Sequence, residues 1–220
     1  MSPPLHSESI FPLSSFPLMK GAAAMNVLIV YCHPSSNSFT FQVKEAFAKG
    51  AADGGNHVEI SDLYADGFDP VMSPQEYTRE AFYDESLDIP QDVKLQQEKV
   101  DRADCIAFIY PDFWTAAPAM LEGWFQRVWT YGYAYGGSPK IHLKKALFLV
   151  TMGGSLNDSV RKEQLEAMKA VMIGDRMHNR ADECVFHVFD EMTRGYGNDE
   201  NRSHRIKLFT KQAYEIGFDL

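Results

Sequence analysis

The sequence holds only three cysteines among 220 residues, too few for a disulfide framework. Cys32 and Cys105 lie in apolar runs and Cys184 begins another, so we expect three buried, inert thiols, as in a reducing cytoplasm. No apolar run approaches ~18 residues, so no membrane-spanning helix is expected. Positive charge is scarce as well, because 21 Lys and Arg face 30 Asp and Glu. The resulting net charge of −9 disfavours a nucleic-acid partner.

The motifs that mark several well-known sites are also missing. No GxGxxG follows the first apolar run, so the Rossmann dinucleotide fingerprint is absent. The chain has neither a Walker lysine loop nor a GxSxG nucleophile elbow. No metal site is expected, because these histidines are scattered without ligand spacing: His33, His57, His142, His178, His187 and His204.

Apolar runs that suit strands alternate with helical patterns along the rest of the chain. The expected strands are Val27–Cys32, His57–Ile60, Cys105–Tyr110, Lys145–Thr151 and Glu183–Phe189. Several are continuous and rich in β-branched residues, which is typical of strands buried on both faces. The alternation predicts an α/β domain with a doubly wound, five-stranded parallel sheet and helices on both faces.

The first 24 residues are rich in proline and serine and show no periodic pattern. They lack the charged start and continuous apolar run of a secretory signal. We expect residues 1–24 to be a flexible extension, or Met25 to be the functional start, with one domain spanning 25–220.

The stretch Tyr110–Gly136 is the most distinctive part of the sequence. An apolar run stops at Pro111, an aromatic loop follows, and a helix is expected from Pro118, because proline suits the first helical turn. Apolar side chains then share one broad helical face: Met120, Leu121, Trp124, Phe125, Val128 and Trp129. The opposite, polar face is formed by Glu122, Gln126 and Arg127. Taken alone, this stretch fits a buried helix and a binding site equally well.

Three loops follow expected strands and should share the edge of the sheet where open α/β sheets bind ligands: His33–Phe39, Pro111–Ala117 and Thr151–Ser155. The first carries hydroxyl and amide side chains directly before a helix, where free N–H groups and the helix dipole favour anions. Serine and asparagine also cap helices without binding a ligand, so this loop alone leaves both interpretations open. His33 is likewise either a catalyst or an ordinary hydrogen-bonding residue.

The other two loops suit a flat ring. Gly153 and Gly154 allow the backbone to approach a ligand closely. Phe113 and Trp114 are placed to flank an aromatic ring. An anion site beside a ring site indicates a flavin nucleotide, which the flavodoxin-like strand order binds between its first and third strands. The protein would position the ring, and the ring would carry the redox chemistry.

Four segments in the right order resemble the NAD(P)H:quinone oxidoreductases of the flavodoxin-like fold. That family includes the bacterial drug-activity-modulator type and the ancillary flavoproteins of potassium efflux systems. The segments are Val27–Thr40, Asp62–Ser73, Tyr110–Val128 and Val150–Ser155. The resemblance implies a homodimeric flavoprotein with FAD, or alternatively FMN. It would take hydride from NADH or NADPH and pass two electrons to a quinone-like acceptor in a ping-pong cycle.

The resemblance also implies roles for individual residues. The cofactor-binding positions would be His33, Asn37, Ser38, Phe39, Pro111, Asp112, Phe113, Trp114, Thr151, Met152, Gly153 and Gly154. The positions implied in catalysis are Trp114, Gly153, Gly154 and Tyr135. Tyr135 matches an aromatic position that roofs the substrate pocket, often from the other subunit.

The chain departs from the family in two places. Asp112 follows the loop proline where an apolar residue is common, and a carboxylate beside the ring would disfavour an anionic reduced flavin. The segment Ser155–Gln164 lacks the Tyr/His pair that assists hydride transfer in animal members.

The resemblance to the family also predicts that part of the Trp124–Tyr133 surface lies in a dimer interface.

Two other functions stay open. One is a regulatory flavoprotein subunit that docks to a transporter or another partner and has incidental reductase activity. It shares every site residue with a reductase, so the sequence barely separates the two. The other is a flavodoxin-like one-electron carrier, which is less favoured because an aromatic roof suits a closed substrate pocket better than an exposed ring edge.

Overall fold

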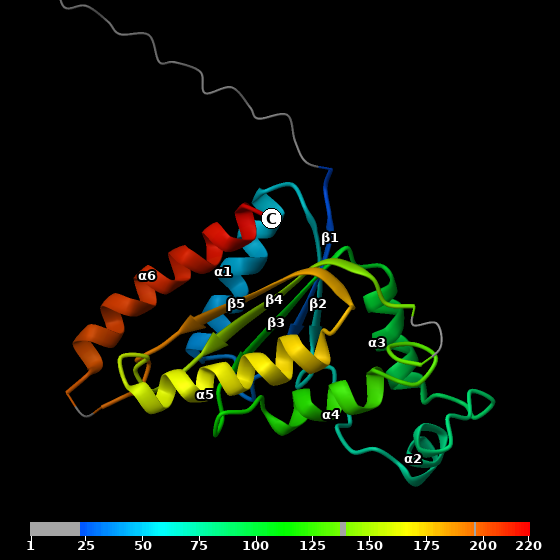
Figure 1. Ribbon diagram of the computed structural model, residues 1–220. Coiled ribbons are helices and arrows are strands. Elements are labelled where there is room, and N and C mark those ends of the chain that lie inside the picture. Colours follow the sequence, from blue (N-terminus) through cyan, green and yellow to red (C-terminus); the bar gives the residue numbers. More distant parts are fainter. Residues whose placement is uncertain (1–22, 137–139, 196) are drawn as a thin grey trace, which may run out of the picture.

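The computed structural model describes residues 23–136, 140–195 and 197–220. Within them, one parallel sheet has the order β2-β1-β3-β4-β5 (Figure 1). The strands are β1 Asn26–Tyr31, β2 His57–Asp62, β3 Cys105–Pro111, β4 Leu143–Thr151 and β5 Ala181–Phe189. The predicted five-stranded, doubly wound α/β fold is confirmed. Residues 1–22 of the predicted extension 1–24 lie outside the described residues.

Helices cover both faces of the sheet, as predicted (Figure 1). Helices α1 and α6 enclose an apolar core on one face, whereas α3, α4 and α5 lie on the other. A π-helix, η1, continues α5, and α2 lies beside α4, away from the sheet. Their bounds are α1 Phe39–Asp53, α2 Pro74–Ala81, α3 Gln91–Asp101, α4 Ala119–Val128, α5 Ser159–Lys169, η1 Ala170–Arg176 and α6 Asp199–Phe218.

The composition of each strand fits its place in the sheet. Every residue of the central strand β3 is buried, because helices cover both of its faces. The edge strand β5 keeps most of its side chains partly exposed and mixes charged residues with apolar ones. Since all the strands are parallel, their carboxyl ends share one edge, and the candidate site forms there.

Helices α1 and α6 touch through their backbones. A Cβ atom at Gly50 would collide with the carbonyl oxygen of Tyr214, and one at Gly217 would collide with that of Phe47. Two glycines on facing helices therefore allow an approach that larger residues would prevent. This packing holds the C-terminal half of α1 against α6, while the other end of α1 lines the candidate site.

Helix α3 is more buried than its polar sequence indicates. Gln96 and Gln97 lie inside the protein although both side chains are polar. The Gln96 carbonyl oxygen accepts from the Trp124 indole at 3.0 Å, and the Gln97 amide donates to the Val128 carbonyl at 3.0 Å. These bonds satisfy both side chains, so the polar face of α3 is buried against α4.

Arg127 corrects the prediction of a polar outer face on α4. Its guanidinium is buried and donates from Nε to Glu76 Oε1 at 2.7 Å. It also pairs with Asp92 at 2.6 Å and donates to the carbonyl of Asp69. Helices α2, α3 and α4 are therefore joined through one arginine.

Most aromatic side chains of Trp124–Tyr133, part of which is predicted to lie in a dimer interface, face the core of their own chain. Trp124, Phe125, Trp129 and Tyr133 are all buried within a single chain. They pack on one another and on the sheet, with the two indole ring centroids 4.8 Å apart. Exposed apolar side chains instead gather on and around α2: Val71, Tyr77, Phe82 and Tyr83.

Two of the three cysteines are buried as expected, and the third, Cys184, is not. All are free, and Cys32 and Cys105 are buried while Cys184 is half-buried. Burial raises the pKa of Cys32 and of Cys105 to about 12, so neither forms a thiolate near neutral pH.

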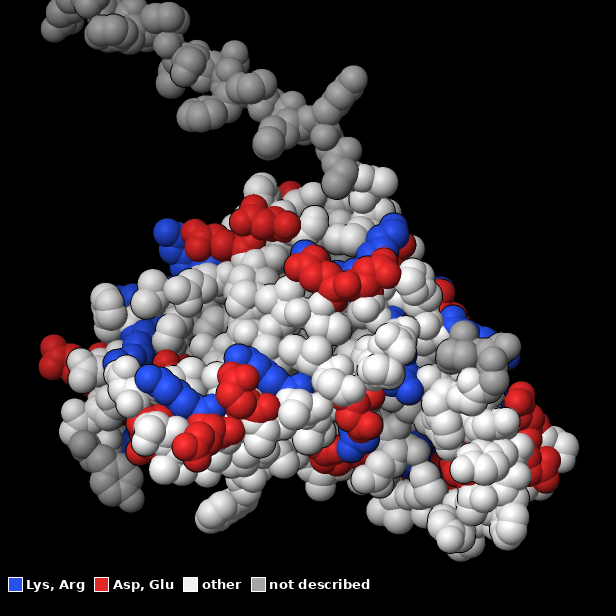
Figure 2. Space-filling model, viewed as in Figure 1, with Lys and Arg blue, Asp and Glu red and all other residues white. Residues whose placement is uncertain are grey.

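The described helices are all too short or too polar to cross a bilayer. On the face seen in Figure 2, Lys and Arg atoms are interspersed with Asp and Glu atoms, and no continuous basic surface crosses it. The arrangement on that face agrees with the excess of negative charge in the sequence.

Candidate functional site

A cavity of about 550 Å³ opens at the carboxyl ends of β1, β3 and β4, and this volume is within the usual range of ligand sites. Three other hollows measure about 370, 540 and 530 Å³, so size alone does not select one. The first cavity stands out because the three predicted loops meet there. Its walls are His33, Ser35, Asn37, Ser38, Phe39, Thr40, Pro111, Asp112, Phe113, Thr151, Met152, Gly153, Met192, Arg194 and Arg202.

The first loop is folded by its own side chains. The Ser35 amide donates to His33 Nδ1 at 2.9 Å, and the Asn37 amide donates to the Ser35 hydroxyl at 3.2 Å. Ser38 is the N-cap of α1, and its hydroxyl accepts from the Phe41 amide at 2.9 Å. These bonds set the N-terminus of α1 at the cavity, where its remaining N–H groups and the helix dipole favour an anion.

His33 is a neutral hydrogen-bonding group in this arrangement. Burial lowers its pKa, and this effect outweighs the opposing influence of the Ser35 backbone. Because Nδ1 accepts a hydrogen bond, Nε2 carries the proton of the neutral ring. His33 therefore offers the cavity a donor without a charge near neutral pH.

The glycine loop presents backbone donors to the cavity. The Thr193 hydroxyl donates to the Gly153 carbonyl at 2.7 Å, and the Glu191 amide donates to the Gly154 carbonyl at 2.8 Å. Within the described ranges, neither glycine amide has a hydrogen-bond acceptor. The loop thus has its carbonyls engaged and two N–H groups available for a ligand.

The aromatic loop is tied to the glycine loop but turns sharply outward. The Asp112 amide donates to the Thr151 carbonyl at 2.8 Å. Phe113 and Ala116 then exchange two backbone bonds, of 3.0 and 3.2 Å. Trp114 and Thr115 have φ values of +57° and +64°, a conformation that costs a non-glycine residue about 1–2 kcal/mol. Trp114 consequently points into solvent, with 99% of its surface exposed.

The structure brings together most of the predicted site residues, but not all. Of the twelve cofactor positions, ten line the cavity, and Trp114 and Gly154 do not. Trp114 stands at the rim beside Phe113, and Gly154 follows Gly153 with Arg161 Nε lying against it. The predicted catalytic set is therefore divided, since only Gly153 lies in the wall.

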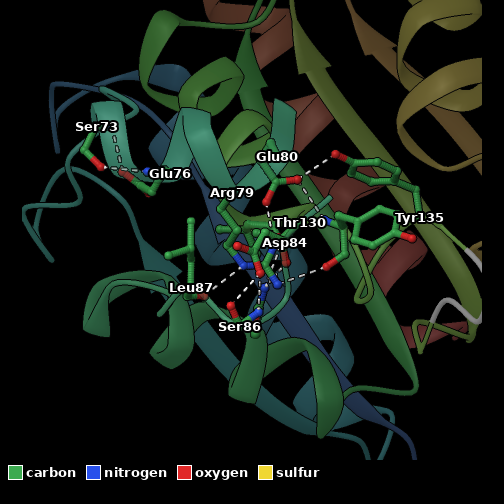
Figure 3. Close-up of polar contacts among 12 residues, drawn as sticks. Ser73, Glu76, Arg79, Glu80, Asp84, Ser86, Leu87, Thr130 and Tyr135 are labelled. Atoms are coloured by element: carbon green, nitrogen blue, oxygen red, sulfur yellow. Dashed lines mark hydrogen bonds and ion pairs between the residues drawn. The ribbon is translucent and has the colours of Figure 1, made fainter. Parts of the chain in front are cut away.

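Tyr135 lies elsewhere within this chain (Figure 3). Its hydroxyl donates to Glu80 Oε2 at 2.6 Å, and the same carboxylate accepts from the Tyr131 amide at 2.8 Å. Glu80 also pairs with Arg79 at 2.6 Å, which anchors the tyrosine loop on α2. Tyr135 lines a different hollow, with Trp129 and Arg180, so it does not close over the cavity of its own chain.

Two arginines of the cavity were missed by the sequence reasoning. Arg194 lies in the loop after β5, and Arg202 lies in the first two turns of α6. Arg202 Nε donates to the Met192 carbonyl at 3.1 Å, while burial and the charge of Arg194 lower its pKa. The argument that located the other loops could also have found Arg194, because β5 ends at the same edge of the sheet and the loop after it carries this residue.

Asp112 is the acidic residue of the wall. Its Oδ1 is buried and has no hydrogen-bond partner among the described residues. Burial raises the pKa of its carboxyl, against the opposing effects of the Thr115 amide, the Arg161 charge and the Ala116 amide. In the part of the chain that the structure describes, no group of three or more His, Cys, Asp or Glu is arranged to hold a metal.

Comparison with known proteins places this geometry in a family. The model of a family described as having a flavodoxin-like fold matches residues 25–176. A solved NAD(P)H:quinone oxidoreductase from Methanothermobacter marburgensis is 37% identical, with a TM-score of 0.80, over 88% of this chain and 96% of that one. General stress protein 14 from Treponema denticola, solved in complex with FMN, shares the fold at 18% identity and a TM-score of 0.58, over 88% and 98% of the two chains.

Among curated proteins, NAD(P)H dehydrogenase [quinone] 1 of Cavia porcellus is 34% identical over 152 residues. The match covers 61% of this chain and 55% of that protein, so the chain spans about half the length of such relatives. Because the family model covers more than half of the chain and the archaeal structure matches it nearly end to end, the chain belongs to the family with the flavodoxin-like fold.

Proposed function

We propose that the protein reduces a quinone or a related acceptor by two electrons, taking hydride from NADH or NADPH through a bound flavin. The observation that carries this proposal is the cavity between the ends of β1 and β3, where a helix N-terminus, the Gly153 loop and an aromatic loop converge. This is the switch point at which the fold binds its ligands. The names of the related oxidoreductases point to the same chemistry.

The residues present fit a flavin nucleotide. Its phosphate would be held by the N-terminus of α1 and by Arg194 and Arg202, which are the cationic groups of the wall. Its ring would lie against Pro111 and Phe113, with the glycine amides donating to its polar edge. When bound, the flavin supplies the hydride chemistry. The chain binds it, orients it and keeps water from one side.

FAD is the better candidate than FMN for this cavity. Anion-binding groups come from two directions, the α1 N-terminus and the arginines beyond β5, which suits a diphosphate better than one phosphate. FMN stays the alternative, and it is the flavin bound by the Treponema denticola protein.

We further propose that the protein acts in the cytoplasm.

A homodimer would complete the pocket. Tyr77, Phe82 and Tyr83 expose large apolar surfaces on and after α2, and exposed patches of this kind mark interaction sites. The Tyr135 hydroxyl donates to Glu80 of α2. Docking of a second copy on α2 would therefore bring Tyr135 near the neighbouring chain. The proposed dimer surface is therefore the exposed apolar side chains on and after α2, in place of the mostly buried aromatic side chains of Trp124–Tyr133.

Steady-state kinetics test the reaction. With NADPH or NADH and benzoquinone as substrates, the flavin-loaded protein should give parallel double-reciprocal lines, because the oxidised nucleotide leaves before the quinone binds. A protein that takes up neither FAD nor FMN would refute the proposal. Intersecting lines would contradict the ping-pong order.

Replacing Trp114 with alanine should weaken flavin affinity about tenfold, since stacking of a ring on an aromatic side chain contributes roughly 1–3 kcal/mol. The exposed indole packs on nothing in the core, so the free energy of unfolding should change by less than about 0.5 kcal/mol. Flavin fluorescence and urea denaturation measure the two quantities.

The matched control is Trp129→Ala. This indole is buried and donates to the Arg176 carbonyl at 2.7 Å, so its loss should cost about 3–5 kcal/mol of stability. The folded fraction should still bind flavin with nearly unchanged affinity. If Trp129→Ala reduced affinity more than Trp114→Ala, the assignment of the aromatic loop would be wrong.

A further inference from the structure

Asp112 is fixed in the cavity wall by its backbone, and the backbone amides of Thr115 and Ala116 act on its carboxyl group. Its amide donates to the Thr151 carbonyl at 2.8 Å, which fixes it across the end of β4. Its Oδ1 is closed off from solvent and has no partner in the described part of the chain. An orphaned carboxyl oxygen in a ligand cavity is costly unless a proton or a ligand satisfies it.

The charged groups around Asp112 do not form an ion pair with it. Arg161 of α5 is the cation that acts on it, but its NH1 donates to Gln164 Oε1 at 2.8 Å. Arg194 and Arg202 line the same cavity, as does the neutral His33. Burial raises the pKa of the Tyr110 hydroxyl on β3, and the negative charge of Asp112 raises it further. The ionised carboxylate is favoured only by the Arg161 charge and by the backbone amides of Thr115 and Ala116, and their combined effect on its pKa is smaller than that of burial.

We propose that Asp112 binds the flavin ring as a neutral acid, donating a hydrogen bond from its carboxyl group to a carbonyl oxygen or ring nitrogen. This inference rests on the proposed function. A protonated carboxyl has one O–H donor, whereas the ionised form only accepts and would repel an acceptor edge. At a pH where the free protein holds Asp112 ionised, binding of the ring is therefore accompanied by uptake of a proton from solvent onto Asp112.

The sign of the pH dependence follows from the pKa. Burial raises the folded-state pKa of Asp112 above the value of about 3.9 in an unfolded chain. The stability that neutral Asp112 gives to the folded protein is fully present below the pKa of the unfolded chain. It is lost as pH rises through the pKa of the folded chain. A ring that needs the O–H donor raises this pKa further. FAD affinity should therefore fall with pH between the pKa of the free and that of the bound protein, by up to tenfold per pH unit.

The test titrates the apoprotein with FAD from pH 5 to 8.5, following flavin fluorescence, and compares wild type with Asp112→Asn and Asp112→Leu. Asparagine keeps an N–H donor but cannot titrate, and leucine has no donor. His33 and the ligand phosphates titrate equally in all three proteins, so differences between slopes belong to Asp112. Urea denaturation at each pH confirms that each protein is folded.

We expect wild-type affinity to fall with pH, Asp112→Asn to bind with a flatter slope, and Asp112→Leu to bind about tenfold more weakly than Asp112→Asn at pH 5. Equal slopes in wild type and Asp112→Asn, or equal affinities of Asp112→Asn and Asp112→Leu, would overturn the role of Asp112 and leave the proposed function intact. Absence of FAD and FMN uptake by all three proteins would overturn the proposed function and this inference together.

Discussion

Replacing Arg127 with alanine is expected to lower the free energy of unfolding by about 3–5 kcal/mol, as the removal of one partner from a buried ion pair does. Glu76 would keep a buried carboxylate without its guanidinium, since only 8% of its side-chain surface is exposed. The backbone carbonyl of Asp69 would lose its donor as well. Because Arg127 joins α2, α3 and α4, we expect the loss as a shift of the whole urea transition.

The matched control is Arg102→Ala. Arg102 also pairs with a carboxylate, because its Nη2 donates to both oxygens of Glu59 at 2.9 and 3.2 Å, but both side chains are exposed. An exposed pair contributes at most about 1 kcal/mol. A loss in Arg127→Ala no greater than in Arg102→Ala would show that the arginine does not hold the three helices together.

Replacing Arg202 with glutamate is expected to weaken FAD affinity at least tenfold. The substitution puts a negative charge in the cavity wall beside Arg194, where an anionic ligand is proposed to bind. The loss should be larger for FAD than for FMN, because we assign the arginines to the part of a diphosphate farther from the ring. It should also shrink as salt is added, since the interaction is partly screened.

Lys207→Glu is the control for Arg202→Glu. Lys207 is an exposed residue of the same helix, so this change alters the net charge of the protein equally without entering the cavity. Fluorescence titrations of both variants with FAD and FMN, together with their melting curves, separate a local effect from a general one. Equal losses in the two variants would refute a phosphate site at Arg202.

The strands and their connecting loops are predictable because they depend on local patterns. The buried run before Pro111 and the glycines after Thr151 mark strand ends without any knowledge of distant contacts. Parallel pairing then brings those ends to one edge, and the loops meet there.

Other features depend on contacts far apart in the sequence. The sequence alone places Arg127 on the solvent-facing side of α4. Its burial is favourable only because Glu76 and Asp92, 51 and 35 positions away, pair with it. The direction of Trp114 is set by two left-handed backbone conformations that its own residue type disfavours. Arg202 comes to the cavity from α6, which follows the other cavity loops by many residues in the sequence and packs on α1. None of these can be obtained from periodicity alone.

The central claim is that the cavity at the carboxyl ends of β1, β3 and β4 holds one flavin per chain and that this flavin carries the electrons. Its most direct test is an anaerobic absorption titration of the FAD-loaded protein. We predict that NADH or NADPH bleaches the visible flavin band with one equivalent per chain, and that one equivalent of benzoquinone restores it. A protein whose visible spectrum stays unchanged on mixing with FAD, or whose bound flavin is not bleached by either nucleotide, would contradict the account.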